Sequence, residues 1–372
     1  MLRVLPALCA LLFAGVVSAQ DGPQGITTPV VLPPFDPSAP SCSAPPGLQK
    51  ILTFAQDNER QFMQGVAKGL AAAAKDRGFQ FRVVLANNDP RLMIEQVQAQ
   101  LADRAGAVVA APVHPPSLAP LLQQVIWSGA YVGTVVPPPA VTLLNAPQYL
   151  TGRVLAEAAA AYIRGRLNGK ANVVLLTHDS LQFLSPRFAA MRDVLQDMPG
   201  VTIVADISPL TVNKEGGLNM MRTILIAHPD VDVVLGADTV VLGALQALRE
   251  AKKSRPDQFL GGIDGEPEAV AEIKSGNSPY KASVSLSSPV FGYALGQFAA
   301  DWMAGKSVPQ AMDILPSLLT QANIAQYEAD FENPGAVFTD PNRRDAYLKM
   351  YGNICFDTRD RYVNFPWSSE RK

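Results

Sequence analysis

From Lys50 onward, short apolar runs alternate with longer stretches in which apolar residues recur every three or four positions. The short runs are apolar on both faces, which predicts strands of a parallel sheet covered on both sides. The longer stretches predict amphipathic helices. We expect nine strands, at 51–55, 80–86, 107–111, 131–135, 172–177, 202–207, 231–235, 259–263 and 281–286. Nine helices are expected at 61–77, 91–104, 117–127, 149–167, 185–196, 217–227, 240–251, 267–274 and 290–304.

Nine strand–helix units exceed what one doubly wound sheet comfortably holds, and they exceed the eight units of a closed barrel. The pattern therefore predicts an α/β protein of two similar doubly wound parallel-sheet lobes. Segment 136–139 ends in three prolines, which donate no ladder hydrogen bonds, so we expect the chain to cross between the lobes there. Two further crossings are expected at 285–289 and near 313–316.

This reading divides the chain into two lobes, a tail and an arm, and the first lobe is made of two separate segments. The first lobe comprises 48–137 plus 288–313, the second lobe comprises 138–287, and a tail at 314–372 packs on the lobes. Residues 20–47 contain eight prolines and few large side chains, which predicts an extended arm rather than a packed element.

The first residues are typical of a secretory signal peptide. Arg3 precedes an apolar run at 4–17, and a small-x-small motif ends at Ala19. The run falls short of the roughly 20 apolar residues that a membrane-spanning helix needs. Cys9 lies inside the run after Leu8, where a lipoprotein would need a small residue. We therefore expect cleavage after Ala19 and a periplasmic protein.

Composition and cysteine usage narrow the class of protein. Hydrophobic residues make up 48% of the chain, and 31 Lys+Arg stand against 33 Asp+Glu. This balance predicts a globular protein and no nucleic-acid partner. Without Cys9, two cysteines are left, Cys42 and Cys355, in a compartment where disulfides persist. We predict that they pair; the alternative is two buried free thiols.

Enzyme signatures are absent from the sequence. It contains no phosphate loop, no G-x-S-x-G nucleophile elbow, no H-E-x-x-H zinc helix and no C-x-x-C pair. We expect no catalysis, no metal site and no cofactor. An enzyme using Asp264 or Asp238 with His178 is a weaker alternative, because no nucleophile and base stand at a recognisable spacing.

Polar side chains gather just past the predicted strands, where ligands bind in open parallel sheets. These positions hold Asp57, Asn58, His114, His178, Asp238 and Asp264, and the nearby helices add Phe62, Met63 and Arg187. Acceptors, one guanidinium and apolar faces suit an uncharged molecule that carries hydroxyl groups. Other roles are open as well: Asp238 as a helix cap, Asp264 as part of a turn, Phe62 and Met63 as core, and the histidines as polar loop residues.

Four motifs of this sequence are similar to motifs of a known family. They are Gly69-Leu70 to Arg77-Gly78-Phe79, Gly217-Leu218-Asn219 to His228-Pro229-Asp230, Leu242-Gly243-Ala244-Leu245, and Gly262-Ile263-Asp264-Gly265. With them, residues 50–304 resemble the periplasmic sugar-binding proteins of the ribose-binding type, which feed ABC importers. The resemblance implies type I lobes joined by a three-crossing hinge that closes on a ligand. A signal peptide and the lack of an N-terminal helix-turn-helix exclude the repressors that share this fold.

The resemblance also assigns ligand contacts. It places the family's aromatic pair on Phe62 and Met63, its cleft arginine on Arg187 and its strand-end aspartate on Asp264. Three other contacts are missing, because the corresponding positions fall on Val136-Pro137, near Val212 and on Ala237. The ligand is then less hydroxylated or partly apolar, or else His114, His178, Asp179 and Asn213 replace the missing partners.

The resemblance implies a protein that captures a small, neutral, carbohydrate-like or partly apolar ligand and presents it to an ABC permease. The alternative is a ligand sensor that signals to a membrane receptor, since the same fold serves both roles. We expect a monomer in either case.

Overall fold

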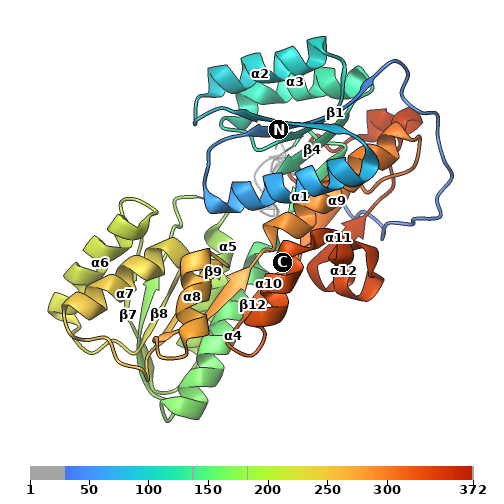
Figure 1. Ribbon diagram of the computed structural model, residues 1–372. Helices are drawn as coiled ribbons and strands as arrows, with labels where there is room; N and C mark the ends of the chain where they lie inside the picture. Colours follow the sequence, from blue (N-terminus) through green and yellow to red (C-terminus); the bar gives the residue numbers. More distant parts are fainter. Residues whose placement is uncertain (1–29, 136–137, 182, 371–372) are drawn as a thin grey trace, which may run out of the picture.

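Two α/β lobes make up the protein (Figure 1). The computed structural model describes residues 30–135, 138–181 and 183–370. The expected signal peptide, its cleavage site and the beginning of the proline-rich arm lie outside these residues. Within them, no helix combines the length and the apolar character that a membrane span requires.

The first lobe contains a seven-stranded sheet in the order β13-β11-β5-β4-β3-β1-β2. Its strands are β1 (Gln49–Gln56), β2 (Gln80–Leu85), β3 (Ala105–Ala110), β4 (Tyr131–Val135), β5 (Thr142–Asn145), β11 (Ala311–Ile314) and β13 (Leu348–Tyr351). Only β13 is antiparallel to its neighbour. One face is covered by α1 (Gln61–Arg77) and α9 (Ser288–Met303), the other by α2 (Pro90–Ala102) and α3 (Pro115–Trp127) (Figure 1).

Small residues let α1 and α9 pack closely in this lobe. A Cβ added at Gly69 would stand 2.1 Å from the backbone oxygen of Pro289, so only glycine fits there. The core between the layers is apolar and fully enclosed, with Phe54, Phe291 and Trp302 among its largest side chains. Such a core holds the strand ends of this lobe in fixed positions.

The second lobe contains a six-stranded sheet in the order β12-β10-β9-β8-β6-β7. Its strands are β6 (Ala171–Leu176), β7 (Val201–Ile207), β8 (Val233–Gly236), β9 (Phe259–Asp264), β10 (Tyr280–Ser285) and the antiparallel β12 (Ser317–Leu319). The helices are α4 (Gln148–Arg166), α5 (Ser185–Gln196), α6 (Lys214–Ala227), α7 (Asp238–Glu250) and α8 (Pro267–Ser275). Two apolar clusters, one under α4 and α5 and one under α6, α7 and α8, cover both faces of the sheet.

The expected strands and helices are all present, and most of their ends differ by only a few residues. The strand β4 and the helices α1 and α5 have the predicted bounds. The pattern missed β5, β11, β12 and β13, each of three or four residues, and the short C-terminal helices α10 (Ile324–Glu332), α11 (Pro334–Thr339), α12 (Pro341–Tyr347) and η1 (Phe356–Arg361). Elements this short carry too little periodicity to be recognised.

The first crossing does not lie where we expected it. Residues 136 and 137 fall outside the described part, but β5 then pairs in parallel with β4 and β11 in the first sheet. The chain therefore enters the second lobe after Asn145, and the predicted boundary between 137 and 138 is wrong. Pro138 and Pro139 thus lie between two strands of the first sheet and not between the lobes.

The later passages between the sheets follow β10 and β11, as expected, and one more was not expected. After β12 and α10, the chain returns to α11, which packs on α9, and then forms β13 in the first sheet. The segment 314–372 is thus more than a tail packed on the lobes, because it adds one strand to each sheet.

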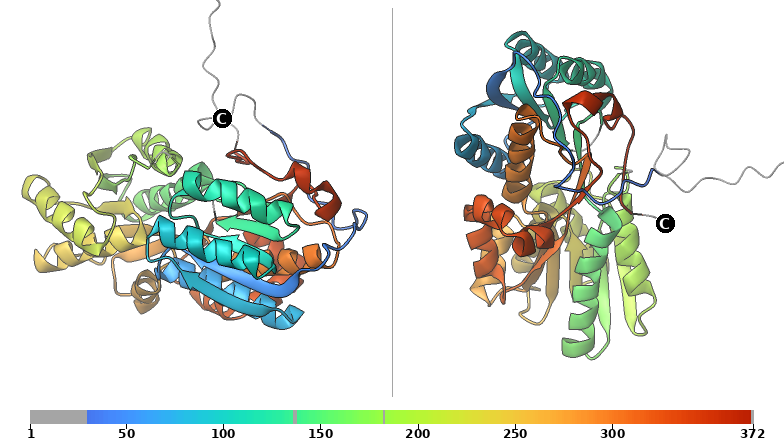
Figure 2. Two further views of the ribbon diagram at one scale, coloured as in Figure 1. Left: turned by 90° about the horizontal axis from the view of Figure 1, so that it is seen from above. Right: turned by 90° about the vertical axis from the view of Figure 1, so that its right-hand side faces the viewer.

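The arm and the C-terminal segment lie side by side along the first lobe (Figure 2). The predicted disulfide Cys42–Cys355 is present, with 6.1 Å between the two Cα atoms. The backbone of Phe35 donates to Met350, and Gly352 donates to Pro33. The arm therefore covers the open edge of β13, where unpaired backbone groups would otherwise be exposed.

Candidate functional site

The site is built around Arg187 and Asp264, which the fold brings together. Arg187 stands in the first turn of α5 and is 6% exposed, and Asp264 ends β9. Burial lowers the pKa of the Arg187 guanidinium, and the charge of Asp264 opposes that shift. Burial raises the pKa of Asp264, while Arg187 and then Arg60 oppose the shift. Arg60 belongs to the first lobe, so this group of charges spans both lobes.

The backbone at Asp264 is strained. Its φ of 119° lies in a region that residues with a side chain rarely adopt, and Gly265 follows with a φ of 70°. Strain of this kind persists where the surroundings hold it and is frequent at functional sites. Asp264 is thus part of a turn, which is one of the roles that the sequence left open. The turn also places its carboxylate at the end of the sheet that bears Arg187.

The side chain of Arg187 is held by α4. Its Nε donates to Oε1 of Gln148 over 2.9 Å. A Cβ added at Gly152, one turn further along α4, would stand 1.8 Å from the backbone oxygen of Arg187. The two helices therefore meet at the residue that carries the guanidinium, and any extra atom there must move it.

Gly152→Ala tests this contact. We expect the variant to weaken ligand binding, because the methyl group pushes the first turn of α5 away from α4. Gly165→Ala is the matched control in the same helix, since nothing lies within 4 Å of its added Cβ. That control should bind normally and gain roughly 0.5–1 kcal/mol of stability from better helix propensity. Calorimetric titration and thermal unfolding of both variants check the prediction, and normal binding by Gly152→Ala would contradict it.

Asp238 does not lie on the ligand-facing surface. It is 0% exposed, and its carboxylate accepts hydrogen bonds from Tyr280 Oη (2.6 Å), Ser283 Oγ (2.7 Å) and the backbone of Glu266 (2.8 Å). Burial raises the pKa of Asp238 to about 6. It makes no side-chain cap for α7. The carboxylate thus has no exposed surface, and it ties β10 and the start of α8 to the sheet.

The predicted aromatic pair divides into two different roles. Met63 is 3% exposed and belongs to the core of the first lobe, which is one of the roles that the sequence left open. Phe62 is half-buried, and its ring centroid lies 5.7 Å from that of Phe291. One edge of Phe62 thus packs on the core, and part of its surface is accessible.

Polar groups of the first lobe lie at the end of β1. Asp57 forms an ion pair with Arg60 over 2.8 Å, and Asn58 donates to Asn88. Burial raises the pKa of Asp57, and Arg60 opposes the shift. Asp57 and Asn58 are both half-buried, so they keep accessible surface at the end of the strand.

The remaining candidates differ in their surroundings. His114 is exposed at the start of α3 and makes no cap there. His178 follows β6, and its Nδ1 is buried without a hydrogen-bond partner among the described residues. Asn213 is exposed and caps α6 by accepting from Gly216. Asp179 forms an ion pair with Arg192. Val136 and Pro137, onto which a missing contact falls, lie outside the described residues.

Three residues that the sequence reading passed over belong to this group. Arg60 follows β1 by four positions, Gln148 holds Arg187, and Glu266 follows Asp264 by two. A search of every charged residue within a few positions of a strand end would have found Arg60 and Glu266. Gln148 has no such signal, because its role depends on how α4 packs on α5.

Glu266 predicts a pH dependence of stability. Burial, with Asp264 and then Asp238 adding to it, raises the pKa of Glu266 from 4.5 to about 7. The folded state therefore binds this proton more tightly than the unfolded chain does, and the free energy of unfolding falls as pH rises between those values. We expect Glu266→Gln to reduce the loss of stability between about pH 5 and about pH 8.

The measurement for Glu266 is the urea midpoint of each protein across this pH range. Glu95→Gln, an exposed glutamate on α2 of the first lobe, is the control and should follow the wild type. Equal pH slopes for wild type and Glu266→Gln would show that the raised pKa is not a feature of the folded protein.

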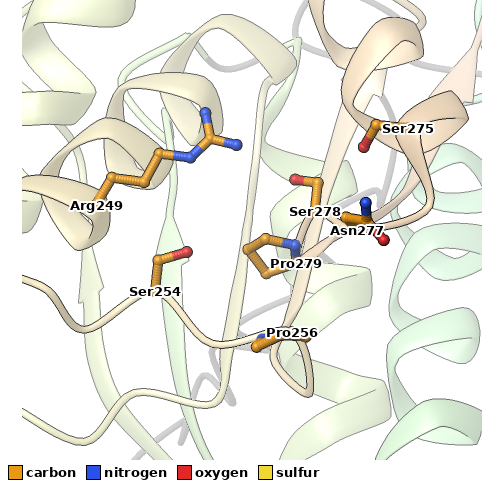
Figure 3. A pocket seen from close by; sticks show the side chains of 7 residues that line it. All are labelled: Arg249, Ser254, Pro256, Ser275, Asn277, Ser278 and Pro279. Atoms are coloured by element: carbon orange, nitrogen blue, oxygen red, sulfur yellow. The ribbon is translucent and has the colours of Figure 1, made fainter.

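A separate cavity lies away from these strand ends (Figure 3). It has a volume of about 260 Å³ and is lined by Arg249, Ser254, Pro256, Ser275, Asn277, Ser278 and Pro279. These residues precede β9 and β10, so the cavity lies toward the amino ends of these strands, opposite to the carboxyl ends that carry the site. Arg249 is paired with Glu272, so its charge is compensated. The described residues include no cluster of three or more His, Cys, Asp or Glu side chains that could hold a metal ion.

Two parallel-sheet lobes that share a group of charges at their strand ends define a class of ligand-binding proteins that close by hinge motion. Residues 51–307 match the family model described as "Periplasmic binding protein domain". The chain belongs to this family.

Known proteins similar to this chain include sugar-import proteins. The ribose import binding protein of Bacillus subtilis (strain 168) is 27% identical over 271 residues, 70% of this chain and 83% of that protein. A putative rhizopine-binding protein of Rhizobium meliloti is 28% identical over 168 residues, 44% of this chain and 53% of that protein.

Solved structures share the fold. A 5-methylthioribose transporter solute-binding protein from Thermotoga lettingae TMO aligns with a TM-score of 0.65 and 21% identity, covering 82% of this chain and 98% of that one. An ABC transporter solute-binding protein from Bacillus halodurans C-125, with bound myo-inositol, aligns with a TM-score of 0.64 and 21% identity, covering 76% and 98%. The two-lobe fold predicted from the sequence is thereby confirmed.

Proposed function

We propose that this protein captures a small, neutral, carbohydrate-like ligand between its lobes in the periplasm and presents it to the permease of an ABC importer. The observation that carries the proposal is the charge group of Arg187, Asp264 and Arg60, which joins strand ends of both lobes. A ligand bound by these residues would connect the lobes. In this proposal the mature chain begins after Ala19 and acts as a monomer.

The chemistry of the group suits hydroxyl groups on a small ring. Arg187 offers donors in a fixed fork, and Asp264 and Asp57 offer acceptors. The accessible part of Phe62 can cover the C–H face of a ring. Relatives named for ribose and rhizopine, and fold neighbours bound to 5-methylthioribose and myo-inositol, carry ligands of this kind.

Binding by this arrangement requires no bond to be made or broken. The energy of the contacts favours the closed arrangement of the lobes, and closure removes water from the charged groups and strengthens their hydrogen bonds. The passages after β5, β10, β11 and α10 are the segments that must bend. A permease can then distinguish the closed protein from the open one by the relative position of the two lobes.

The experiment is calorimetric titration of the purified protein with D-ribose, myo-inositol and 5-methylthioribose, together with mass spectrometry of small molecules that co-purify. We expect at least one polyhydroxylated ligand to bind at one site per chain. Scattering before and after addition should show a more compact monomer. If no titrated or co-purified small molecule bound, or if binding left the shape unchanged, the proposal would fail.

A further inference from the structure

The C-terminal end of the described chain reaches the second lobe at the first turn of α4 (Figure 2). Glu370 accepts a hydrogen bond from the backbone N–H of Leu150 at Oε1 (2.8 Å) and one from that of Tyr149 at Oε2 (3.1 Å). Both carboxylate oxygens are therefore directed at the start of this helix. The contact joins residues 220 and 221 positions apart.

This contact supplies what the local sequence of α4 lacks. The N-cap residue is Pro147, which makes no side-chain cap, and the first turn contains no acidic residue. The first N–H groups of a helix have no partner within the helix, and a negative charge is favourable there. Glu370 meets both needs from the far end of the chain.

The same turn of α4 holds the arginine of the ligand site. Gln148, next to the two capped residues, accepts the hydrogen bond from Arg187 Nε. The backbone of Arg187 also lies against Gly152, one turn further on. The path from Glu370 to Arg187 thus consists of two hydrogen-bonded steps through one helical turn.

The segment that carries Glu370 is fixed to the first lobe. Cys355 is bonded to Cys42, Val363 exchanges backbone hydrogen bonds with Ala140, and Trp367 donates to the backbone of Val30. The ring of Trp367 also packs on Tyr351, with 5.1 Å between centroids. Cys355, Val363 and Trp367 all lie beyond residue 307, where the family match ends. Of their partners, only Ala140 lies within the matched residues, since Cys42 and Val30 belong to the arm and Tyr351 to β13.

We infer that Glu370 is a positioning residue for ligand binding: the C-terminal segment caps α4 and thereby holds Gln148 and Arg187 in place for the ligand. This inference rests on the proposed function and adds to it a part of the chain outside the matched family domain. Loss of the carboxylate lets the first turn of α4 open. Gln148 then no longer fixes the guanidinium beside Asp264, so affinity falls although Glu370 is not a ligand contact.

The test compares Glu370→Ala and Glu370→Gln with the wild type by calorimetric titration with D-ribose and myo-inositol. A helix cap corresponds to about a fivefold change in an equilibrium constant, so Glu370→Ala should weaken binding about fivefold. Glu370→Gln keeps one acceptor oxygen and should lose less. Asp340→Asn is the matched control, because Asp340 caps α12 in the same segment without any link to Arg187.

A double-mutant cycle separates positioning from general stability. If Glu370 acts through Arg187, Glu370→Ala should have little further effect on affinity in an Arg187→Ala background. A full fivefold loss in that background would overturn the inference. Normal affinity of Glu370→Ala in the otherwise wild-type protein would overturn it as well.

Amide hydrogen exchange provides a measurement that needs no ligand. Residues 148–152 and 185–190 should exchange faster in Glu370→Ala and unchanged in Asp340→Asn. Faster exchange at 148–152 alone would show a cap that does not reach Arg187, which overturns the positioning role. If the wild type bound neither sugar, that would count against those sugars as ligands, and the exchange at 185–190 would still decide the inference.

Discussion

Arg187→Ala should remove most of the ligand affinity. The guanidinium is buried, and under the proposed function it donates hydrogen bonds to an uncharged ligand in a site that closure shields from water. Removing one partner of such a bond costs about 2–4 kcal/mol, roughly 30- to 700-fold in Kd. Titration of the purified variant with the ligand found for the wild type measures the loss.

Arg192→Ala is the control for removing a guanidinium from the same helix. Arg192 pairs with Asp179 and Asp206. It is not one of the two arginines whose charges act on Asp264. This variant should bind with nearly wild-type affinity. If both variants bound equally well, Arg187 would have no part in the site. If both lost binding, the cause would be the folding of α5, which circular dichroism of the unliganded proteins would show.

Removing the disulfide should produce the largest loss of stability. Cys42 and Cys355 are separated by 313 positions in the sequence. A disulfide typically stabilises a folded chain by about 2–4 kcal/mol. Cys42→Ser with Cys355→Ser should therefore unfold at lower urea concentration. The arm should also exchange its amide hydrogens faster, because the bridge fixes it beside β13.

Reduction of the wild type is the matched comparison. The wild type in reductant should unfold like the double serine variant, and the variant should not respond to reductant. A wild-type midpoint that did not move on reduction would mean that the packing around Trp367, Phe365 and Leu32 alone holds the arm and the C-terminal segment together.

The sequence was sufficient to predict the elements that carry their own pattern. Strands such as β3, which is buried on both faces, are visible in the sequence as apolar runs. The periodicity of α1 predicts both of its ends. The strands β5, β11, β12 and β13 form because partners distant in sequence meet them. Their three or four residues contain no signal that distinguishes them from loops.

The site was predictable only in part for a related reason. Asp238 and Asp264 both follow buried strands, and the sequence gives them equal standing. The structure separates them, because Tyr280 and Ser283 enclose Asp238, while the charges of Arg187 and then Arg60 act on the pKa of Asp264. Such differences depend on side chains from other elements. The same holds for Gln148 and Glu370, whose roles follow from contacts rather than from position along the chain.

The order of strands in the first sheet bears on how the protein folds as it is synthesised. All strands of the second sheet except β12 come from the continuous stretch 171–285, so most of that lobe can form early. The first sheet needs β11 and β13, which emerge much later. Until β11 has been synthesised, the strands within 49–145 therefore leave the edge of β5 unpaired while the second lobe folds. The first lobe to be made is the last to be completed.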